Sequence, residues 1–279
     1  IQEAGEPSYR VKQIQEWLWQ KHAHSFDDMS NLSKALRQKL VEQFTLPALS
    51  LDATQLSEDG TLKTRFRTFD DHMIEGVLIP TTERKTACVS SQIGCSLSCK
   101  FCATGYMDRK RNLSFDEIYD QVVYINQQSE AAHEKHLSNI VFMGMGEPLA
   151  NYNRLMSAVR TMVAEQPNGL GMSARQITVS TVGLVPAIKK LAEENLMVTF
   201  ALSLHAPDDE LRDELILVNS KWKVDEALDA AREYFDKTGR RVSIEYALIR
   251  DMNDHAWRAD LLAEKLNARG KGWVQIGRA

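Results

Sequence analysis

The chain has 279 residues, which is enough to bury a large core in one or two domains. Its hydrophobic content of 43% and charged content of 26% are typical of globular proteins. No apolar run is long enough to span a membrane, and the start IQEAGEPSYR has no signal-peptide character. We therefore expect a cytoplasmic protein without a membrane partner. The net charge of −4 excludes a globally basic nucleic-acid binder, so any nucleic-acid contact needs local basic surface.

Residues 1–46 are predicted to form a small helical accessory domain. Ser8 can cap a first helix, whose apolar positions at helical spacing are Val11, Ile14, Trp17 and Leu18. A second helix would carry Leu32, Leu36 and Leu40 on one face. Because this piece is short, we expect it to dock on the larger remainder of the chain.

Residues 47–80 change to a period of two, which is typical of strands. The EDG sequence at Glu58–Gly60 is a hairpin signal between LSLDATQL and TLKTRFRTF, and a third strand, HMIEGVLIP, comes next. We expect an antiparallel β-ribbon that links the helical domain to the rest.

Residues 81–279 alternate between strand and helix patterns, which predicts an α/β domain with a parallel sheet. The expected strands are 85–90, 138–143, 176–181, 197–203, 241–249 and 273–276. The expected helices are 114–128, 151–165, 186–194, 207–216, 224–237 and 254–268. Ser114 and Glu117 predict a capping box, and Gly239 predicts a helix end. Periodicity alone leaves two architectures open, a partial barrel and a doubly wound sheet.

All four cysteines, Cys88, Cys95, Cys99 and Cys102, lie within fifteen consecutive positions. Such a cluster in an intracellular chain indicates a metal site rather than a disulfide framework. The last three have the spacing C-x3-C-x2-C in a loop after the first parallel strand. Three thiolates from one loop can hold three irons of a [4Fe–4S] cluster and leave the fourth iron without a protein ligand.

Zinc is the alternative metal. A structural zinc site needs four ligands, and the fourth could only be Cys88 or a distant histidine such as His136 or His205. The single C-x2-C pair also differs from the paired knuckles of most zinc motifs, so the spacing favours iron–sulfur. A non-catalytic, zinc-bound RNA-binding module is the corresponding alternative function.

Longer motifs resemble a known family. CVSSQIGCSLSCKFCATGYMDRKRNL, VFMGMGEPLANY, ITVSTVG and ALSLHAPDDELRDEL succeed one another, and GEPSYRVKQIQEWLW stands at the front. In this order they resemble the RlmN/Cfr family of radical S-adenosylmethionine (SAM) RNA methyltransferases, from residue 5 to residue 270. The resemblance implies a partial (β/α)6 barrel that binds a [4Fe–4S] cluster and SAM.

The resemblance also implies a reaction. Members of the RlmN branch methylate C2 of an adenosine in 23S rRNA and of the adenosine beside the anticodon of certain tRNAs. The Cfr branch methylates C8, which is the alternative within the family. A deoxyadenosyl radical removes hydrogen from a methylated cysteine, the resulting carbon radical adds to the base, and a second cysteine resolves the crosslink as a disulfide. A flavodoxin-type electron donor and a monomeric protein are expected.

The resemblance assigns roles to individual residues. Cys88 matches the resolving cysteine and Glu75 the proton acceptor, although a buried strand cysteine and a solvated strand glutamate are the plain alternatives. Cys95, Cys99 and Cys102 match the cluster ligands. The implied SAM contacts are Gly146, Glu147, Ser180, Ser203, Leu204 and His205. Most of them lie just after strand ends, where parallel α/β folds bind ligands.

Two basic groups could contact RNA phosphates. Lys63, Arg65 and Arg67 alternate along one expected strand, and Arg109, Lys110 and Arg111 come after the cysteine loop. Surface charge that keeps the protein soluble explains either group equally well.

The chain departs from the family at its C-terminal side. No cysteine comes after Cys102, whereas the family's methyl-carrying cysteine lies beyond the sixth strand. We therefore expect a sequence truncated at both ends, and we expect that these 279 residues bind a cluster but do not methylate RNA by themselves.

Overall fold

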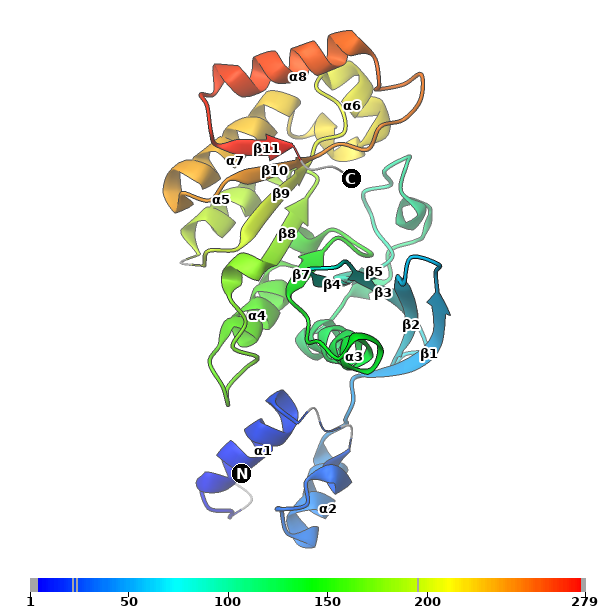
Figure 1. The fold of residues 1–279 in the computed structure, drawn as a ribbon, viewed down its shortest axis with the longest axis vertical. Coiled ribbons are helices and arrows are strands. Elements are labelled where there is room, and N and C mark those ends of the chain that lie inside the picture. Colours follow the sequence, from blue (N-terminus) through cyan, green and yellow to red (C-terminus); the bar gives the residue numbers. More distant parts are fainter. Residues whose placement is uncertain (1–4, 22, 24, 195, 277–279) are drawn as a thin grey trace.

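The computed structural model describes residues 5–21, 23, 25–194 and 196–276. Residues 1–4 of the expected first domain and 277–279 of the expected last domain lie outside this part of the chain. A small helical lobe stands at one end of the molecule and is joined to a larger α/β body by the start of a long strand (Figure 1). None of the helices in the described residues combines the length and apolarity needed to cross a membrane.

The small lobe, called the helical unit below, contains α1 (Tyr9–Trp19), the 3-10 turn η1 (Phe26–Asp28) and α2 (Lys34–Gln43). Its core confirms the predicted apolar face and consists of Phe26, Met29, Leu32, Leu36 and Leu40. Two details differ from expectation. Ser8 has helical backbone angles and its side chain caps none of the described N–H groups, and Val11 is 39% exposed because it faces away from this core.

The predicted ribbon is present as β1 (Leu49–Leu56), β2 (Leu62–Thr68) and β3 (Met73–Pro80). The first hairpin turns at Gly60, whose φ of +84° explains the glycine there. β3 also pairs with the first parallel strand, so the ribbon continues the main sheet.

The main sheet has nine strands in the order β1-β2-β3-β4-β7-β8-β9-β10-β11. Its parallel part consists of β4 (Lys85–Cys88), β7 (Asn139–Phe142), β8 (Ile177–Thr181), β9 (Thr199–Ser203), β10 (Val242–Glu245) and β11 (Val274–Ile276). These strands are neighbours in chain order, whereas a doubly wound sheet reverses its order. The architecture is therefore the partial barrel, and a separate two-stranded sheet joins β5 (Gln92–Ile93) to β6 (Arg111–Asn112).

Helices connect the parallel strands at each predicted place. They are α3 (Phe115–His133), α4 (Tyr152–Val163), α5 (Val185–Glu193), α6 (Asp209–Leu215), α7 (Val224–Thr238) and α8 (Ala256–Ala268). The capping box of Ser114 and Glu117 begins α3, and Gly239 ends α7 in the left-handed conformation, both as predicted. Short 3-10 turns complete the loops: η2 (Ala103–Tyr106), η3 (Pro148–Asn151), η4 (Ala174–Gln176) and η5 (Leu217–Ser220).

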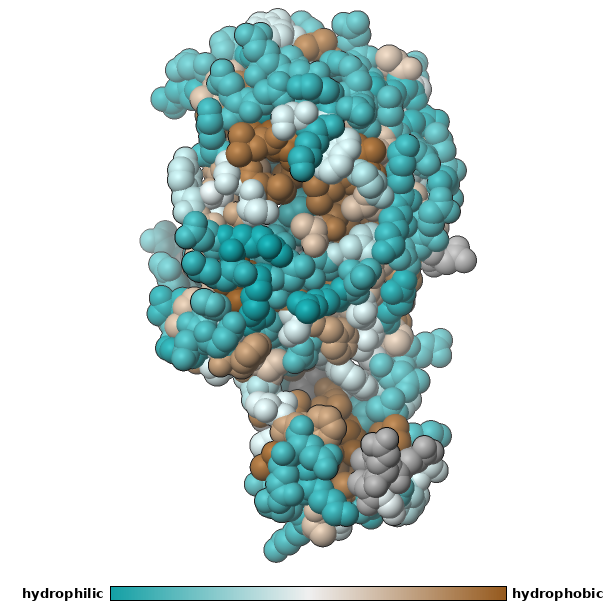
Figure 2. Space-filling model, turned by 180° about the vertical axis from the view of Figure 1, so that it is seen from behind, coloured by the Kyte–Doolittle hydropathy of each residue, from teal (hydrophilic) through white to brown (hydrophobic). Residues whose placement is uncertain are grey.

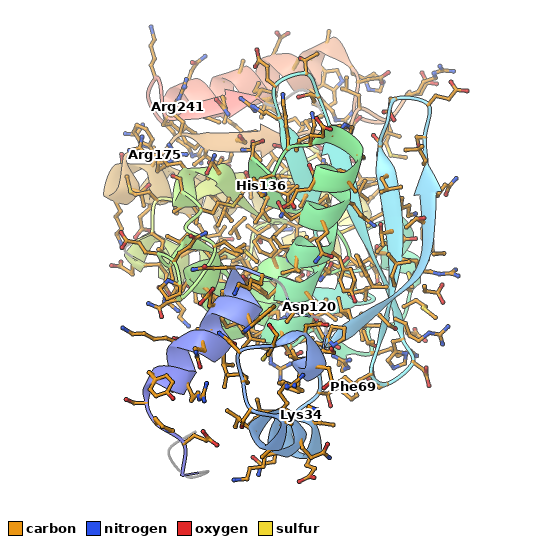
Figure 3. The ribbon with its side chains drawn as sticks, turned by 60° about the horizontal axis from the view of Figure 1, so that its bottom comes forward. Lys34, Phe69, Asp120, His136, Arg175 and Arg241 are labelled. Carbon is orange, nitrogen blue, oxygen red and sulfur yellow. The ribbon has the colours of Figure 1, made fainter. Side chains whose placement is uncertain are left out.

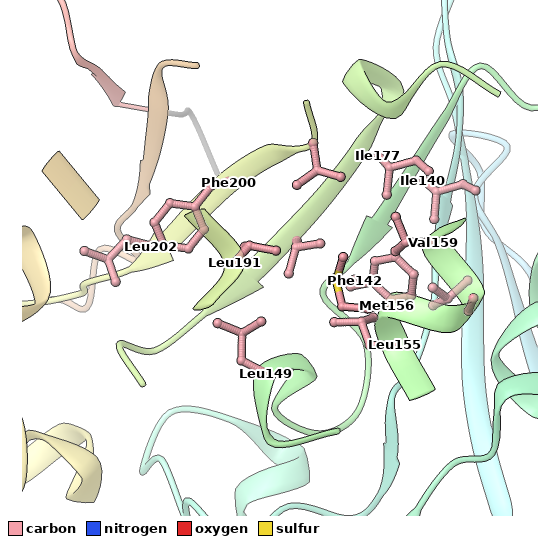
Figure 4. Close-up of a cluster of buried hydrophobic side chains, with 14 of the residues drawn as sticks. Ile140, Phe142, Leu149, Leu155, Met156, Val159, Ile177, Leu191, Phe200 and Leu202 are labelled. Atoms are coloured by element: carbon pink, nitrogen blue, oxygen red, sulfur yellow. The ribbon is translucent and has the colours of Figure 1, made fainter. Parts of the chain in front are cut away.

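The core lies between the helices and the outer face of the sheet. Ile140, Phe142, Ile177 and Phe200 alternate along the strands and pack against α4 and α5, which contribute Leu155, Met156, Val159 and Leu191 (Figure 4). Side chains between these positions point to the inner face of the barrel. Seen from behind, apolar side chains gather in a patch within the larger body, and polar ones surround it (Figure 2).

Candidate active site

The cysteine loop lies at the carboxyl end of the parallel sheet, between β5 and β6. Cys99 is buried, and Cys95 and Cys102 are half-buried. All three line one cavity of about 320 Å³, called the cysteine cavity below. Burial raises the pKa of Cys99 to about 12, and the neighbouring Cys95 and Cys102 add to this shift. A thiol of this kind becomes a thiolate only when a cation or metal compensates the charge.

Strand register determines which side chains reach the inner face of the barrel. Glu245 of β10 pairs with Ser203 of β9, and Ser180 of β8 pairs with Ala201, two residues before Ser203. Because paired residues share a face, the side chains of Ser180, Ser203 and Glu245 point the same way, and all three line the cysteine cavity. Ser180 is anchored by donating its hydroxyl to the Phe142 carbonyl at 2.7 Å.

Leu204 differs from the other expected contacts. Its side chain is fully buried in the core, on the opposite side of the strand from Ser203. Only its backbone is near the cysteine cavity, with the N–H donated to the Glu245 carbonyl at 3.1 Å. Any role of Leu204 in ligand binding therefore depends on its main chain.

Gly146 and Glu147 come after β7 and line the cysteine cavity. Gly146 has a φ of +91°, and a Cβ there would lie 2.4 Å from the Cβ of Gln92, so that only glycine fits. Glu147 is 3% exposed, and its carboxylate accepts the Leu149 N–H at 3.1 Å and the Val182 N–H at 3.2 Å. Burial raises the pKa of Glu147 to about 7, against the opposing effect of these hydrogen bonds.

His205 lies at the end of β9 with a φ of +60° and lines the cysteine cavity. Its ring packs edge-on against Phe101 of the cysteine loop, with 4.6 Å between the ring centroids. Nδ1 accepts the Ala247 N–H at 3.0 Å, which places the proton of the neutral imidazole on Nε2. Burial lowers the pKa of His205 to about 4, so the ring is neutral at physiological pH.

Glu75 and Cys88 lie on the inner face of the sheet but are not among the residues that line the cysteine cavity. Val77 of β3 pairs with Cys88 of β4, and Glu75 is two residues from Val77, so the side chains of Glu75 and Cys88 share this face. Burial raises the pKa of Cys88 to about 11, against a hydrogen bond from the Met143 backbone. Met143 also lines the cysteine cavity, so its backbone connects Cys88 to that cavity.

Most residues of the two basic groups are engaged in ion pairs, whereas Arg109 donates to Asn112 Oδ1 at 2.9 Å. Arg65 and Arg67 both bind Asp52, the extra residue of a bulge in β1, at 2.6 and 2.8 Å. Lys63 binds the Glu75 carboxylate at 2.8 Å. These residues share one exposed face of β2, as predicted.

Arg111 holds the β2–β3 turn to the start of α3. Its guanidinium makes hydrogen bonds of 2.6 to 2.8 Å to both carboxylate oxygens of Asp70 and of Glu117. These bonds show a structural role for Arg111, and its contact with an RNA phosphate stays a prediction.

Sequence reasoning missed two residues beside the cysteine cavity. Arg212 of α6 is fully buried behind it, and Glu245 is half-buried in its wall with a pKa raised by burial. Arg212 had one signal in the sequence, since it is the single cation in DDELRDEL. Glu245 had none beyond its place at a strand end.

The residues of the cysteine cavity fit an iron–sulfur cluster with SAM. Three thiols from one loop suit the soft iron ions. The cavity beside them has a volume within the range of small-ligand sites and polar groups from three strand ends. Among the described residues, no three His, Cys, Asp or Glu side chains are arranged around a point that could hold a single metal ion.

Comparisons with known proteins agree with this geometry. The model of the radical SAM superfamily matches residues 89–262, and the model of the ribosomal RNA large subunit methyltransferase N-terminal domain matches residues 1–46. A crystal structure of a radical SAM methyltransferase from Sphaerobacter thermophilus superposes with a TM-score of 0.93 at 42% identity. The match covers 98% of this chain and 79% of that one.

Curated relatives are similar over nearly the whole chain. A probable dual-specificity RNA methyltransferase RlmN from Kocuria rhizophila is 51% identical, over 99% of this chain and 74% of the relative. Proteins of the same description from Kineococcus radiotolerans and Salinispora tropica are 50% and 52% identical, over 98% and 96% of this chain and 71% and 74% of their own lengths. The chain therefore belongs to the radical SAM superfamily and, within it, to the RlmN family of RNA methyltransferases.

Proposed function

We propose that the protein to which this chain belongs methylates C2 of adenosine, in 23S rRNA and in tRNA beside the anticodon, through a methylated cysteine that is not one of the four cysteines of these 279 residues. The observation that carries the proposal is that the register of the sheet brings Glu75, Cys88, Ser180 and Ser203 to the same inner face, next to the three-cysteine loop. One face thus holds the groups for cluster binding, SAM binding and proton removal. Cytoplasmic location and a flavodoxin-type electron donor belong to the same proposal.

Cys95, Cys99 and Cys102 would hold the cluster, and Gly146, Ser180, Ser203 and His205 would surround SAM. When bound, the cluster supplies the electron that splits SAM homolytically. Glu147 would position the loops after β7 and β8, because its two carboxylate oxygens accept the Leu149 and Val182 N–H groups. The apolar residues of the cysteine cavity, which include Leu97 and Val182, would keep water from the reacting groups.

Glu75 is the proposed proton acceptor for C2. Its carboxylate is half-exposed and paired with Lys63, so it is accessible from the inner face. Cys88 is the proposed resolving cysteine. Its raised pKa keeps the thiol protonated until a base takes the proton, which suits a group that reacts last.

The zinc alternative has less support. His136 lies before β7, at the amino edge of the sheet and away from the cysteines, together with Arg175 and Arg241 (Figure 3). His205 is near the cysteines, but its Nδ1 is occupied by Ala247.

Two measurements test the proposal. The chain reconstituted without oxygen is expected to bind iron and sulfide and to release 5′-deoxyadenosine from SAM when reduced. A variant with Cys95, Cys99 and Cys102 replaced by Ala should lose both, whereas stoichiometric zinc without sulfide would support the RNA-binding module.

The position of the methyl group is tested in cells. Mass spectrometry of 23S rRNA and tRNA should show 2-methyladenosine in cells that carry the gene, and its loss when the gene is deleted or carries Glu75→Gln. Appearance of 8-methyladenosine instead would contradict the C2 assignment and identify the Cfr-type reaction.

A further inference from the structure

Arg212 connects the loops that form one side of the cysteine cavity. Its Nε donates to the Leu204 carbonyl at 2.9 Å, and its Nη2 donates to the carbonyls of Val182 and Ser203. Its Nη1 donates to Asn219 Oδ1 at 2.7 Å. One fully buried side chain therefore holds the ends of β8 and β9 together.

Within the described part of the chain, the charge of Arg212 has no anionic hydrogen-bond partner, since all four of these acceptors are neutral oxygens. A guanidinium remains protonated in proteins, and burial of an uncompensated charge is costly. Asp209 and Asp213 interact with Arg212 electrostatically, but their carboxylates are hydrogen-bonded to Asn219 rather than to Arg212. Asp213 also pairs with Lys223 at 2.8 Å.

A closer countercharge can come from the cysteine loop, which packs on α6. The Lys100 N–H donates to the Leu215 carbonyl at 3.1 Å, and Cys99 belongs to an apolar cluster with Leu211 and Leu215. Arg212 directly follows Leu211 on α6, and its side chain interacts electrostatically with that of Cys99.

Val182 is bound on both sides by buried charged groups. Its N–H donates to the Glu147 carboxylate at 3.2 Å, and its carbonyl accepts from Arg212. Val182 itself lines the cysteine cavity. Movement of Arg212 would therefore also move the segment that Glu147 holds.

We propose that Arg212 is a positioning residue that holds the ends of β8 and β9 at the SAM site and supplies the fixed countercharge of the Cys99 thiolate when the cluster is bound. The proposal rests on the cluster site under "Proposed function". A positive charge behind the cluster stabilises the added electron, so Arg212 raises the reduction potential of the cluster. Its hydrogen bonds to Val182 and Ser203 keep the SAM contacts in place.

The test uses the 279-residue chain reconstituted with iron and sulfide without oxygen. Arg212→Gln removes the charge but keeps two donors, and Arg212→Lys keeps the charge but loses the planar fork. Arg240→Gln is the matched control, because Arg240 binds Thr199 at the opposite end of the same strands. Reduction potentials come from spectroelectrochemical titration, and SAM affinity comes from the EPR change of the reduced cluster during titration with SAM.

We expect the potential to fall in R212Q and to stay near that of the wild type in R212K and R240Q. Both Arg212 variants should bind SAM roughly tenfold more weakly, since buried carbonyls lose their donors, and R240Q should bind it normally.

An R212Q potential equal to that of the wild type would overturn the countercharge role of Arg212. Unchanged SAM affinity in both Arg212 variants would overturn its positioning role. If R212Q does not fold, a fall of the potential in R212K would count against the countercharge. A wild-type chain that binds no cluster would instead overturn the proposed function, and the role of Arg212 with it.

Discussion

Glu147 illustrates how burial changes the meaning of a residue that a motif identifies. The family resemblance implies that Glu147 contacts SAM. In the structure both carboxylate oxygens accept backbone N–H groups, from Leu149 in the next turn and from Val182 after β8. The carboxylate therefore fixes two segments of the cysteine cavity, and its raised pKa makes the stability of this arrangement depend on pH.

Substitution Glu147→Gln should change that pH dependence. The pKa of Glu147 is about 7 in the folded chain, above its ordinary value of 4.5. Between these values the folded state binds one proton more than the unfolded state, so the free energy of unfolding falls as pH rises through this window. The stability of the wild type relative to E147Q should thus decrease by about 3 kcal/mol from pH 4.5 to pH 7.

Urea denaturation of the metal-free proteins at several pH values measures this difference. His205, whose lowered pKa gives the opposite slope, titrates in both proteins and cancels. Parallel pH profiles for E147Q and the wild type would show that Glu147 is already ionised in the folded chain.

At the scale of elements, Arg111 joins three pieces that are separate in the sequence. It belongs to β6, and its two carboxylate partners are Asp70 in the β2–β3 turn and Glu117 in the first turn of α3. The Glu117 side chain is 1% exposed and also accepts the Ser114 N–H at 2.8 Å. Arg111 therefore ties the ribbon to the barrel through Glu117, which also completes the N-terminal cap of α3.

Arg111→Met should destabilise the chain by about 3 kcal/mol, because it leaves the Glu117 carboxylate buried without its cation. Arg111→Lys should recover part of this loss, since it restores the charge but not the paired hydrogen bonds. Arg109→Met, two positions earlier and exposed, should change stability by less than about 0.5 kcal/mol. Urea denaturation compares the three variants, and similar losses in R109M and R111M would contradict the structural role of Arg111.

At the scale of the whole molecule, contacts with α3 attach the helical unit to the body. Trp19, at the end of α1, packs edge-on against Tyr119 and Phe115 of α3, at centroid distances of 4.8 and 6.3 Å. Asp120, on the same helix, accepts the N–H groups of Ala48 and Leu49 where the chain enters β1 (Figure 3). The first contact fixes the helical unit, and the second fixes the chain segment that leaves it.

Trp19→Ala should loosen the helical unit without unfolding the barrel. Aromatic contacts of this kind contribute about 1 kcal/mol beyond area burial, so amide exchange in α1 should accelerate roughly tenfold. The Ala48 and Leu49 amides should stay protected, because their acceptor Asp120 is unchanged. Hydrogen exchange with mass spectrometry measures both regions, and equal acceleration throughout the barrel would show that Trp19 stabilises the whole molecule.

Much of the fold is determined by local patterns. The alternation of parallel strands and helices, the hairpin at Gly60, the capping box at Ser114 and the end of α7 at Gly239 each depend on neighbouring residues, whose spacing and backbone preferences are visible in the sequence. The cysteine triad is equally local, since three ligands from one short loop need no distant partner. The motifs around them identified the family for the same reason.

Long-range pairing was decided only by the tertiary structure. Strand patterns alone do not specify the order of strands; the family resemblance implied the partial barrel, and the observed neighbours confirm it against a doubly wound sheet. Nor does a charged residue in the sequence reveal its partner: Arg111 finds Asp70 forty-one positions away, and Arg212 reaches Val182 thirty positions away. Burial of a charge and the identity of its partner depend on how distant segments pack, and packing is the property that the sequence by itself leaves undetermined.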